Sequence, residues 1–218
     1  MLLDRRCGGC RRPGPSLCGA CRSRLAIPPA LAGHAAAAAG RLDHLVALTA
    51  YGDLAARLVL VAKNGGRVDV LYALADELAG TLVEAGHPFD EVTWVPASGE
   101  GRRRRGFDQG ALLARRIARR HRLPVRRLLR RTAGEAQRGG SRAARLVGPG
   151  LHPTRRRPRP RVLVVDDVTT TGASLAAAAT ALRAGGAVSV IGAVVAVVGE
   201  ARPVVDGLTG RMVDAPTL

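Results

Sequence analysis

The sequence is poor in aromatic residues, in lysine and in long apolar segments. Aromatic side chains make up 2% of its 218 residues, and Lys63 is the only lysine. The longest apolar run, residues 188–198, is shorter than the ~20 residues that a membrane-spanning helix needs, and the first residues contain no apolar segment of the kind found in signal peptides. We therefore expect a soluble, cytoplasmic protein without membrane partners, and with few rings for stacking against nucleic-acid bases.

Positive charge is concentrated in one segment of the chain. Residues 102–161 contain 21 arginines and two acids, a net charge of +19, whereas the remainder of the chain carries −2. A general preference for arginine over lysine explains the residue type but not the clustering. The clustering favours an anionic partner, and the alternative is a solvated surface whose charge is screened by salt.

All four cysteines lie in the first 21 residues, as the pairs Cys7/Cys10 and Cys18/Cys21. Two Cys-x-x-Cys turns can present four thiolates tetrahedrally to Zn²⁺. A thioredoxin-like redox site is the alternative, but it needs one pair rather than two and a strand–helix pattern that follows neither pair here. We predict a structural zinc module over residues 1–27, whose folding depends on the metal.

Apolar segments alternate with helical patterns along residues 45–198, after a linker rich in proline and alanine at residues 28–44. The pattern predicts strands at residues 45–51, 91–96, 162–165 and 188–198, and helices at residues 53–63, 68–85, 109–121 and 173–184. Such alternation is typical of an α/β fold with a mainly parallel sheet flanked by helices. Tyr51 and Trp94 are predicted to lie in the core, and residues 199–218 to form a C-terminal tail.

An acidic pair follows the strand predicted at residues 162–165. The sequence there is Asp166-Asp167-Val168-Thr169-Thr170-Thr171-Gly172-Ala173-Ser174. Open parallel sheets bind ligands at the carboxyl ends of their strands. Paired carboxylates at such an end can accept hydrogen bonds from vicinal ribose hydroxyls or bind a divalent metal. A loop of small hydroxylated residues that opens a helix favours a phosphate.

This segment resembles the motif with which type I phosphoribosyltransferases bind 5-phosphoribosyl-1-pyrophosphate (PRPP). Nearly the whole chain is similar to the ComF/GntX family of phosphoribosyltransferase-like proteins. The broader resemblance is carried by the four cysteines, Ala50-Tyr51-Gly52, Leu60-Val61-Ala62-Lys63, Trp94-Val95-Pro96, Arg103-Arg104-Arg105-Gly106-Phe107-Asp108-Gln109, and Gln137 with Arg145. It implies a type I phosphoribosyltransferase-like sheet with a small four-cysteine zinc module, and PRPP bound together with Mg²⁺.

The resemblance also implies a role for each part of the site. Asp166 and Asp167 would be catalytic, holding the ribose hydroxyls and Mg²⁺, while residues 169–174 would bind the 5′-phosphate. The other implied residues are Pro96, Ala97 and Ser98 for the pyrophosphate, Lys63 and Arg103 as PRPP-binding cations, and Arg105 as a catalytic cation on a basic flap over residues 97–160.

Two departures from related sequences bear on the chemistry. Thr170 stands where purine-salvage enzymes of this fold carry an aspartate base, and Ser98 stands where a histidine is usual in the ComF/GntX pattern. Because a threonine hydroxyl does not accept a proton near neutral pH, nucleobase salvage is disfavoured. If the protein is catalytic, pyrophosphate would be displaced by an unidentified acceptor, and an amine or amide is compatible with the missing base. The competing hypothesis is a non-catalytic adaptor in natural competence and DNA uptake, binding single-stranded DNA or DNA-processing proteins.

Overall fold

The computed structural model describes residues 5–25, 41–64, 66–132, 150–154 and 159–198, and the backbone of residues 204–205 and 212–213. Most of the linker, part of the flap and most of the C-terminal tail predicted from the sequence lie outside these residues. Among the described residues, no helix combines the length and the apolar character required to cross a membrane.

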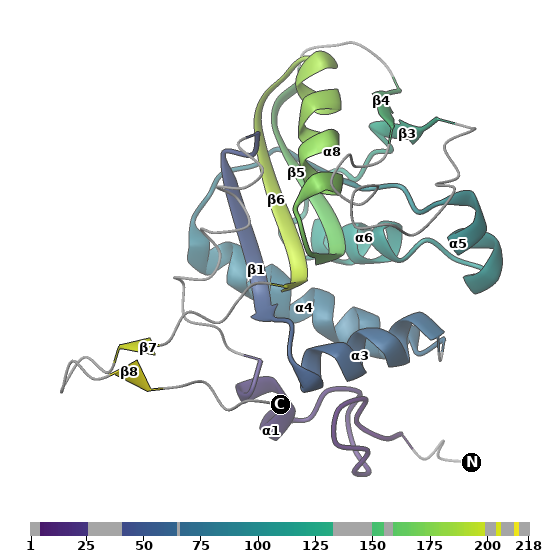
Figure 1. Cartoon of the computed structure of the whole chain (residues 1–218), viewed down its shortest axis with the longest axis vertical. Coiled ribbons are helices and arrows are strands. Elements are labelled where there is room, and N and C mark those ends of the chain that lie inside the picture. Colours follow the sequence, from purple (N-terminus) through teal and green to yellow (C-terminus); the bar gives the residue numbers. More distant parts are fainter. Residues whose placement is uncertain are drawn as a thin grey trace.

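Four parallel strands form the central sheet (Figure 1), which confirms the predicted α/β fold. In spatial order they are β1 (His44–Ala50), β6 (Ala187–Val197), β5 (Arg159–Thr169) and β2 (Glu91–Trp94). The two inner strands are the long ones, and the side chains in their central parts, residues 162–165 and 190–197, are buried on both faces of the sheet. Strands covered on both sides need continuous apolar runs, which is why the sequence shows little polar alternation there.

Helices cover both faces of this sheet. One face carries α4 (Val68–Ala85) and α6 (Gln109–His121), and α3 (Asp53–Asn64) packs against α4 near the carboxyl ends of the strands. The other face carries α8 (Ala173–Ala184) with the antiparallel ribbon of β3 (Leu129–Arg131) and β4 (Leu151–Pro153). Successive residues of a strand point to opposite faces. On β5, Leu163 and Val165 therefore join the core under α4 and α6, while Val162 and Val164 join the core under α8.

Local signals set the ends of several helices where they were predicted. Asp108 precedes α6 and accepts a hydrogen bond from the Ala111 amide at 3.3 Å, so it caps the helix. Gly86 ends α4 with a φ of 67°, a left-handed conformation that glycine adopts without a steric penalty. These two boundaries lie at the predicted residues because each cap acts on backbone groups only a few residues away.

Two predictions about the strands are wrong. The predicted strand at residues 162–165 is too short, because β5 continues to Thr169 opposite Val197 of the long strand β6. The acidic pair therefore lies inside β5 rather than after it. Tyr51 is 40% exposed and lies beyond the end of β1, whereas Trp94 is buried as predicted.

Three shorter elements complete the described chain. The cysteine segment contains α1 (Gly19–Ser23), and the predicted flap begins with α5 (Gly99–Arg105). A small antiparallel ribbon pairs β7 (Val204–Val205) with β8 (Met212–Val213). Sequence periodicity predicted none of these elements, because segments this short hold too few residues to show a repeat.

Candidate functional site

The carboxyl ends of β2 and β5 lie at the switch point of the sheet, the place where open parallel sheets bind ligands in a crevice. The chain leaves β2 toward α6 on one face and leaves β5 toward α8 on the other, so neither connection covers the ends of the two strands. Trp94, the last residue of β2, pairs with Val165. From Asp166 onward β5 has no partner from β2, so its acidic pair lies at this switch point.

The acidic pair is oriented by the backbone next to it. The Asp167 amide donates to Asp166 Oδ1 at 2.9 Å, and the Val168 amide donates to Asp167 Oδ1 at 2.8 Å. Burial and the adjacent Asp167 carboxylate raise the pKa of Asp166 well above its usual value. Two carboxylates held this close favour a group that brings positive charge or hydrogen-bond donors, such as a divalent cation or a diol.

Lys63 reaches the acidic pair from the end of α3. Its Nζ lies 2.9 Å from Asp167 Oδ2, and both side chains are largely shielded from solvent. Its charge also counteracts the rise in the pKa of Asp166. The only lysine of the chain is thus a point charge at the predicted site, not a solvated helix end.

The loop after β2 is fixed by two polar side chains. Asp108 Oδ2 accepts hydrogen bonds at 3.3 Å from the Ala97 amide and from Trp94 Nε1. Arg131 Nε donates to the Pro96 carbonyl at 3.1 Å from the end of β3. The loop predicted to hold pyrophosphate is therefore anchored beside the acidic pair.

Sequence reasoning missed Arg131. Burial lowers the pKa of its guanidinium, and the negative charges of Asp166 and Asp108 oppose that change, so all three groups share one electrostatic environment. The sequence held little signal for it, because β3 is only three residues long and two of them are arginines. Among 21 arginines in the basic segment, nothing in the sequence singled out Arg131.

The predicted phosphate loop joins β5 to α8. Thr169 is buried at the end of the strand, and Gly172 adopts a φ of 75° immediately before the helix begins. Thr171 Oγ1 accepts a hydrogen bond from the Ala173 amide at 3.4 Å. The N-terminus of α8, with the hydroxyls of Thr170 and Ser174 nearby in sequence, offers the donors and the dipole that an anion requires.

The flap residues lie apart from this cluster. Ser98 caps α5 by accepting a hydrogen bond from the Gly101 amide at 3.1 Å. Arg103 is exposed, and Arg105 Nε is buried without a hydrogen-bond partner among the described residues. In the described part of the chain, neither arginine pairs with Asp166 or Asp167.

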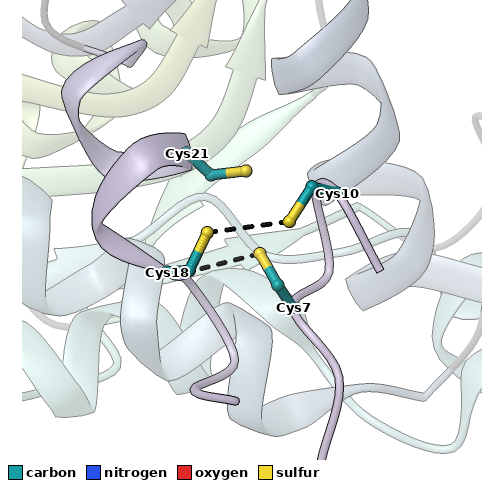
Figure 2. A group of neighbouring side chains, drawn as sticks. All are labelled: Cys7, Cys10, Cys18 and Cys21. Carbon is teal, nitrogen blue, oxygen red and sulfur yellow. Dashed lines mark hydrogen bonds between the residues drawn. The ribbon is translucent and has the colours of Figure 1, made fainter. Parts of the chain in front are cut away.

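The four cysteines converge as predicted (Figure 2). Their Sγ atoms all lie within 4.8 Å of one another, and Cys10 Sγ and Cys18 Sγ are 3.7 Å apart. A Zn–S bond of about 2.3 Å gives a tetrahedral S–S edge of about 3.8 Å, so the cluster has the size and the chemistry of a four-thiolate zinc site. All four thiols are free of disulfides.

Two of the thiols differ strongly in acidity. Burial by itself raises the pKa of Cys7. Hydrogen bonds with the backbone of Cys18, Cys10 and Gly9 outweigh burial, so the net pKa is lowered to about 6. Burial and the neighbouring cysteines raise the pKa of Cys21 to about 12. Cys7 is therefore a thiolate at neutral pH and is ready to bind a cation.

Parts of the chain are similar to several solved structures. Glutamine PRPP amidotransferase from B. subtilis, complexed with ADP and GMP, is 25% identical with a TM-score of 0.40, and the match covers 58% of this chain and 27% of the amidotransferase. Purine phosphoribosyltransferase from Pyrococcus horikoshii Ot3 is 20% identical with a TM-score of 0.39, over 59% of this chain and 72% of that one.

A third similar structure is adenine phosphoribosyltransferase from Thermoanaerobacter pseudethanolicus, with 15% identity and a TM-score of 0.40 over 62% of this chain and 83% of that one. Several of these structures are thus phosphoribosyltransferases. This chain spans about a quarter of the length of the amidotransferase. No family model and no curated protein matches the sequence.

Proposed function

We propose that this protein binds Mg²⁺–PRPP in the crevice between β2 and β5 and transfers its phosphoribosyl group to an amine or amide acceptor. The observation that carries the proposal is the acidic pair, Asp166 and Asp167, which has Lys63 2.9 Å away and a glycine-containing loop leading into α8. The resemblance of residues 162–174 to the PRPP motif of type I phosphoribosyltransferases supports it as well.

Each part of the crevice suits one part of PRPP. Asp166 and Asp167 accept hydrogen bonds from the two ribose hydroxyls, and the start of α8 takes the 5′-phosphate through backbone amides and the helix dipole. The loop containing Ala97, with Arg131 beside it, faces the pyrophosphate. Mg²⁺ would be held by the acidic pair, whose carboxylate oxygens it prefers, and would neutralise charge on the departing pyrophosphate.

The proposed reaction is a displacement at the ribose C1. A nitrogen lone pair of the acceptor forms the new bond to C1, the bond from C1 to the pyrophosphate oxygen breaks, and pyrophosphate leaves with that electron pair. The acceptor nitrogen then loses a proton to water. Thr170 supplies no base, so the protein accelerates the reaction by positioning and by charge stabilisation.

We further propose membership of the ComF/GntX family, because the cysteine pairs, Lys63 and the acidic pair occur in the order typical of that family. Ser98 replaces the usual histidine after β2. Its hydroxyl caps α5 instead of titrating near neutral pH, so the proposed mechanism includes no histidine.

Binding of single-stranded DNA is the second candidate function, and the face of α6 supports it. Arg115 and Arg119 are exposed there, while Arg116 and Arg120 are paired with Asp76. Contacts from such arginines to DNA phosphates would weaken steeply with added salt and show little sequence preference. A flat salt response in an equilibrium binding assay would remove this function.

Calorimetric titration of PRPP, with and without Mg²⁺, tests the first proposal. We expect Mg²⁺-dependent binding that falls by about 100-fold or more in the Asp166→Asn/Asp167→Asn variant, because two charge-assisted hydrogen bonds and a metal site are lost. DNA binding by this variant should match that of the unmodified chain. If the variant retains its PRPP affinity, the site assignment is wrong; if the unmodified protein does not bind PRPP, the proposed function fails.

A further inference from the structure

The cysteine cluster and Lys63 are connected through a single helix, α3. The first metal-binding turn rests directly on this helix. A Cβ atom added to Gly9 would lie 2.7 Å from Leu54 Cδ1, and one added to Gly8 would lie 3.2 Å from Leu58 Cδ2 and 2.8 Å from Val70 of α4. A side chain at either glycine would displace these neighbours, so the backbone between Cys7 and Cys10 packs closely against α3 and α4.

Hydrogen bonds reinforce this packing. Arg57 of α3 donates from Nη1 to the Gly9 carbonyl at 3.0 Å, within the Cys7–Cys10 turn. At the beginning of α4, Ser16 donates to Asp69 Oδ2 at 2.6 Å. Arg67, which precedes α4, donates to the Arg6 carbonyl at 2.9 Å. The cysteine segment therefore contacts the helices on both sides of the short connection that follows Lys63.

Lys63 lies in the last turn of α3, six residues after Arg57 and therefore about 9 Å further along the helix axis. Both residues belong to the same helix, so a contact that fixes Arg57 also restrains the last turn, which contains Lys63. In the part of the chain that the structure describes, Lys63 is also the only cation in direct contact with the acidic pair. The contacts of Arg57 with the metal-binding turn and of Lys63 with Asp167 thus lie on one helix.

We propose that the metal-loaded cysteine cluster holds α3 so that Lys63 stays on Asp167, with Arg57 as the positioning residue between them. The consequence for PRPP affinity rests on the proposed function, but the coupling between the cluster and α3 does not. When the metal leaves, the Cys7–Cys10 turn is no longer fixed by its thiolates. The Gly9 carbonyl then moves away from Arg57, and the end of α3 loosens.

A double-mutant cycle on PRPP affinity tests the positioning role. In the zinc-loaded protein we expect Arg57→Ala to weaken Mg²⁺–PRPP binding about tenfold, and the same change in a Lys63→Ala background to have less than a twofold effect. Arg24→Ala, which removes an exposed arginine at the end of α1, is the matched control and should leave affinity unchanged. Equal losses in both backgrounds would overturn the proposal, because they would show that Arg57 acts independently of Lys63.

Hydrogen exchange provides a readout that needs no PRPP. We expect amides of residues 58–64 to exchange at least tenfold faster in protein stripped of zinc by a chelator, while amides of α8 keep their rates. Unchanged exchange in α3 would refute the coupling even if PRPP binds. Faster exchange in α3 together with an absence of PRPP binding would support the coupling and refute the proposed function, so the two failures are distinguishable. Where Arg57→Ala does not fold, zinc removal from the unmodified chain decides the question.

Discussion

Asp76 on α4 and the acidic pair on β5 are carboxylate sites with opposite charge balances. Asp76 is one carboxylate with two guanidinium partners, since Arg116 donates to it at 2.6 and 2.7 Å and Arg120 at 2.9 Å. The acidic pair is two carboxylates with one ammonium partner, Lys63. The charge of Asp76 is balanced by cations of the protein itself, whereas the acidic pair has more carboxylates than cationic partners.

The pKa values express the same difference. Burial raises the pKa of Asp76, but the hydrogen bonds from Arg116 and Arg120 lower it more, so the net change is downward. For Asp166, burial and the charge of Asp167 act in the same direction and raise the pKa well above its usual value. A carboxylate whose charge is stabilised by its neighbours contributes to stability, whereas one whose charge is opposed is available to a ligand.

The largest effect is expected at Asp76. Asp76→Asn removes the charge that two arginines share and should lower the free energy of unfolding by about 2 kcal/mol, measured by urea denaturation. PRPP affinity should not change, because α4 carries no residue of the crevice. Glu84→Gln, which alters an exposed acid on the same helix, is the control and should have little effect. If this variant lost PRPP binding but kept its stability, Asp76 would be a ligand-binding residue and not a stabilising one.

Acidification should remove the same contribution. Because the pKa of Asp76 is lower in the folded protein than its ordinary value of 3.8, its stabilisation is fully present above that value and disappears as the pH falls through the folded pKa. The difference in stability between the unmodified protein and Asp76→Asn should therefore shrink below about pH 4. A difference that stays constant between pH 7 and pH 3 would contradict this assignment.

Arg131 should give an intermediate effect, on binding rather than on folding. Removing its charge with Arg131→Gln should weaken Mg²⁺–PRPP binding about tenfold, or ~1.4 kcal/mol, because the pyrophosphate loses a cation next to the Pro96 loop. Arg130→Gln changes the exposed neighbour on the same strand and should leave affinity within twofold. Equal losses in the two variants would indicate a general charge effect and not a specific contact.

The smallest effect has the opposite sign to that at Asp76. Asp166→Asn should stabilise the ligand-free protein by about 1 kcal/mol near neutral pH, because it removes a charge that burial and Asp167 oppose. The same variant should bind PRPP more weakly. Thermal unfolding at pH 7 without ligand measures the gain, and a lower melting temperature would show that the Asp166 charge is stabilised by its surroundings.

Local signals account for the parts of the fold that the sequence predicted. The cap at Asp108 and the glycine after α4 act on neighbouring backbone groups, so these helix boundaries were predictable. The length of β5 was not, because its last residues are held by β6 and not by an apolar pattern of their own. Tyr51 was placed in the core on the basis of a strand pattern, but β1 ends one residue before it.

The candidate site also has a part that local sequence predicts and a part that depends on contacts between distant segments. The sequence predicted the acidic pair, the loop before α8 and the cysteine cluster, because each is a run of residues that are close along the chain. Arg131 and the anchoring of the Ala97 amide by Asp108 depend on contacts between distant segments. Arg103 and Arg105 were predicted at the site from a resemblance, and in the described residues neither contacts the acidic pair.

The sequence by itself determined which groups are available: two adjacent carboxylates, a helix-opening loop, four thiols and one lysine. Only the tertiary structure decided which charges meet. Lys63 and Asp167 are 104 residues apart, and their 2.9 Å contact exists because α3 packs beside the sheet on one side and against the cysteine turn on the other. Hydrophobic burial, which is non-directional and acts over the whole chain, places that helix, and no local pattern encodes the resulting distance.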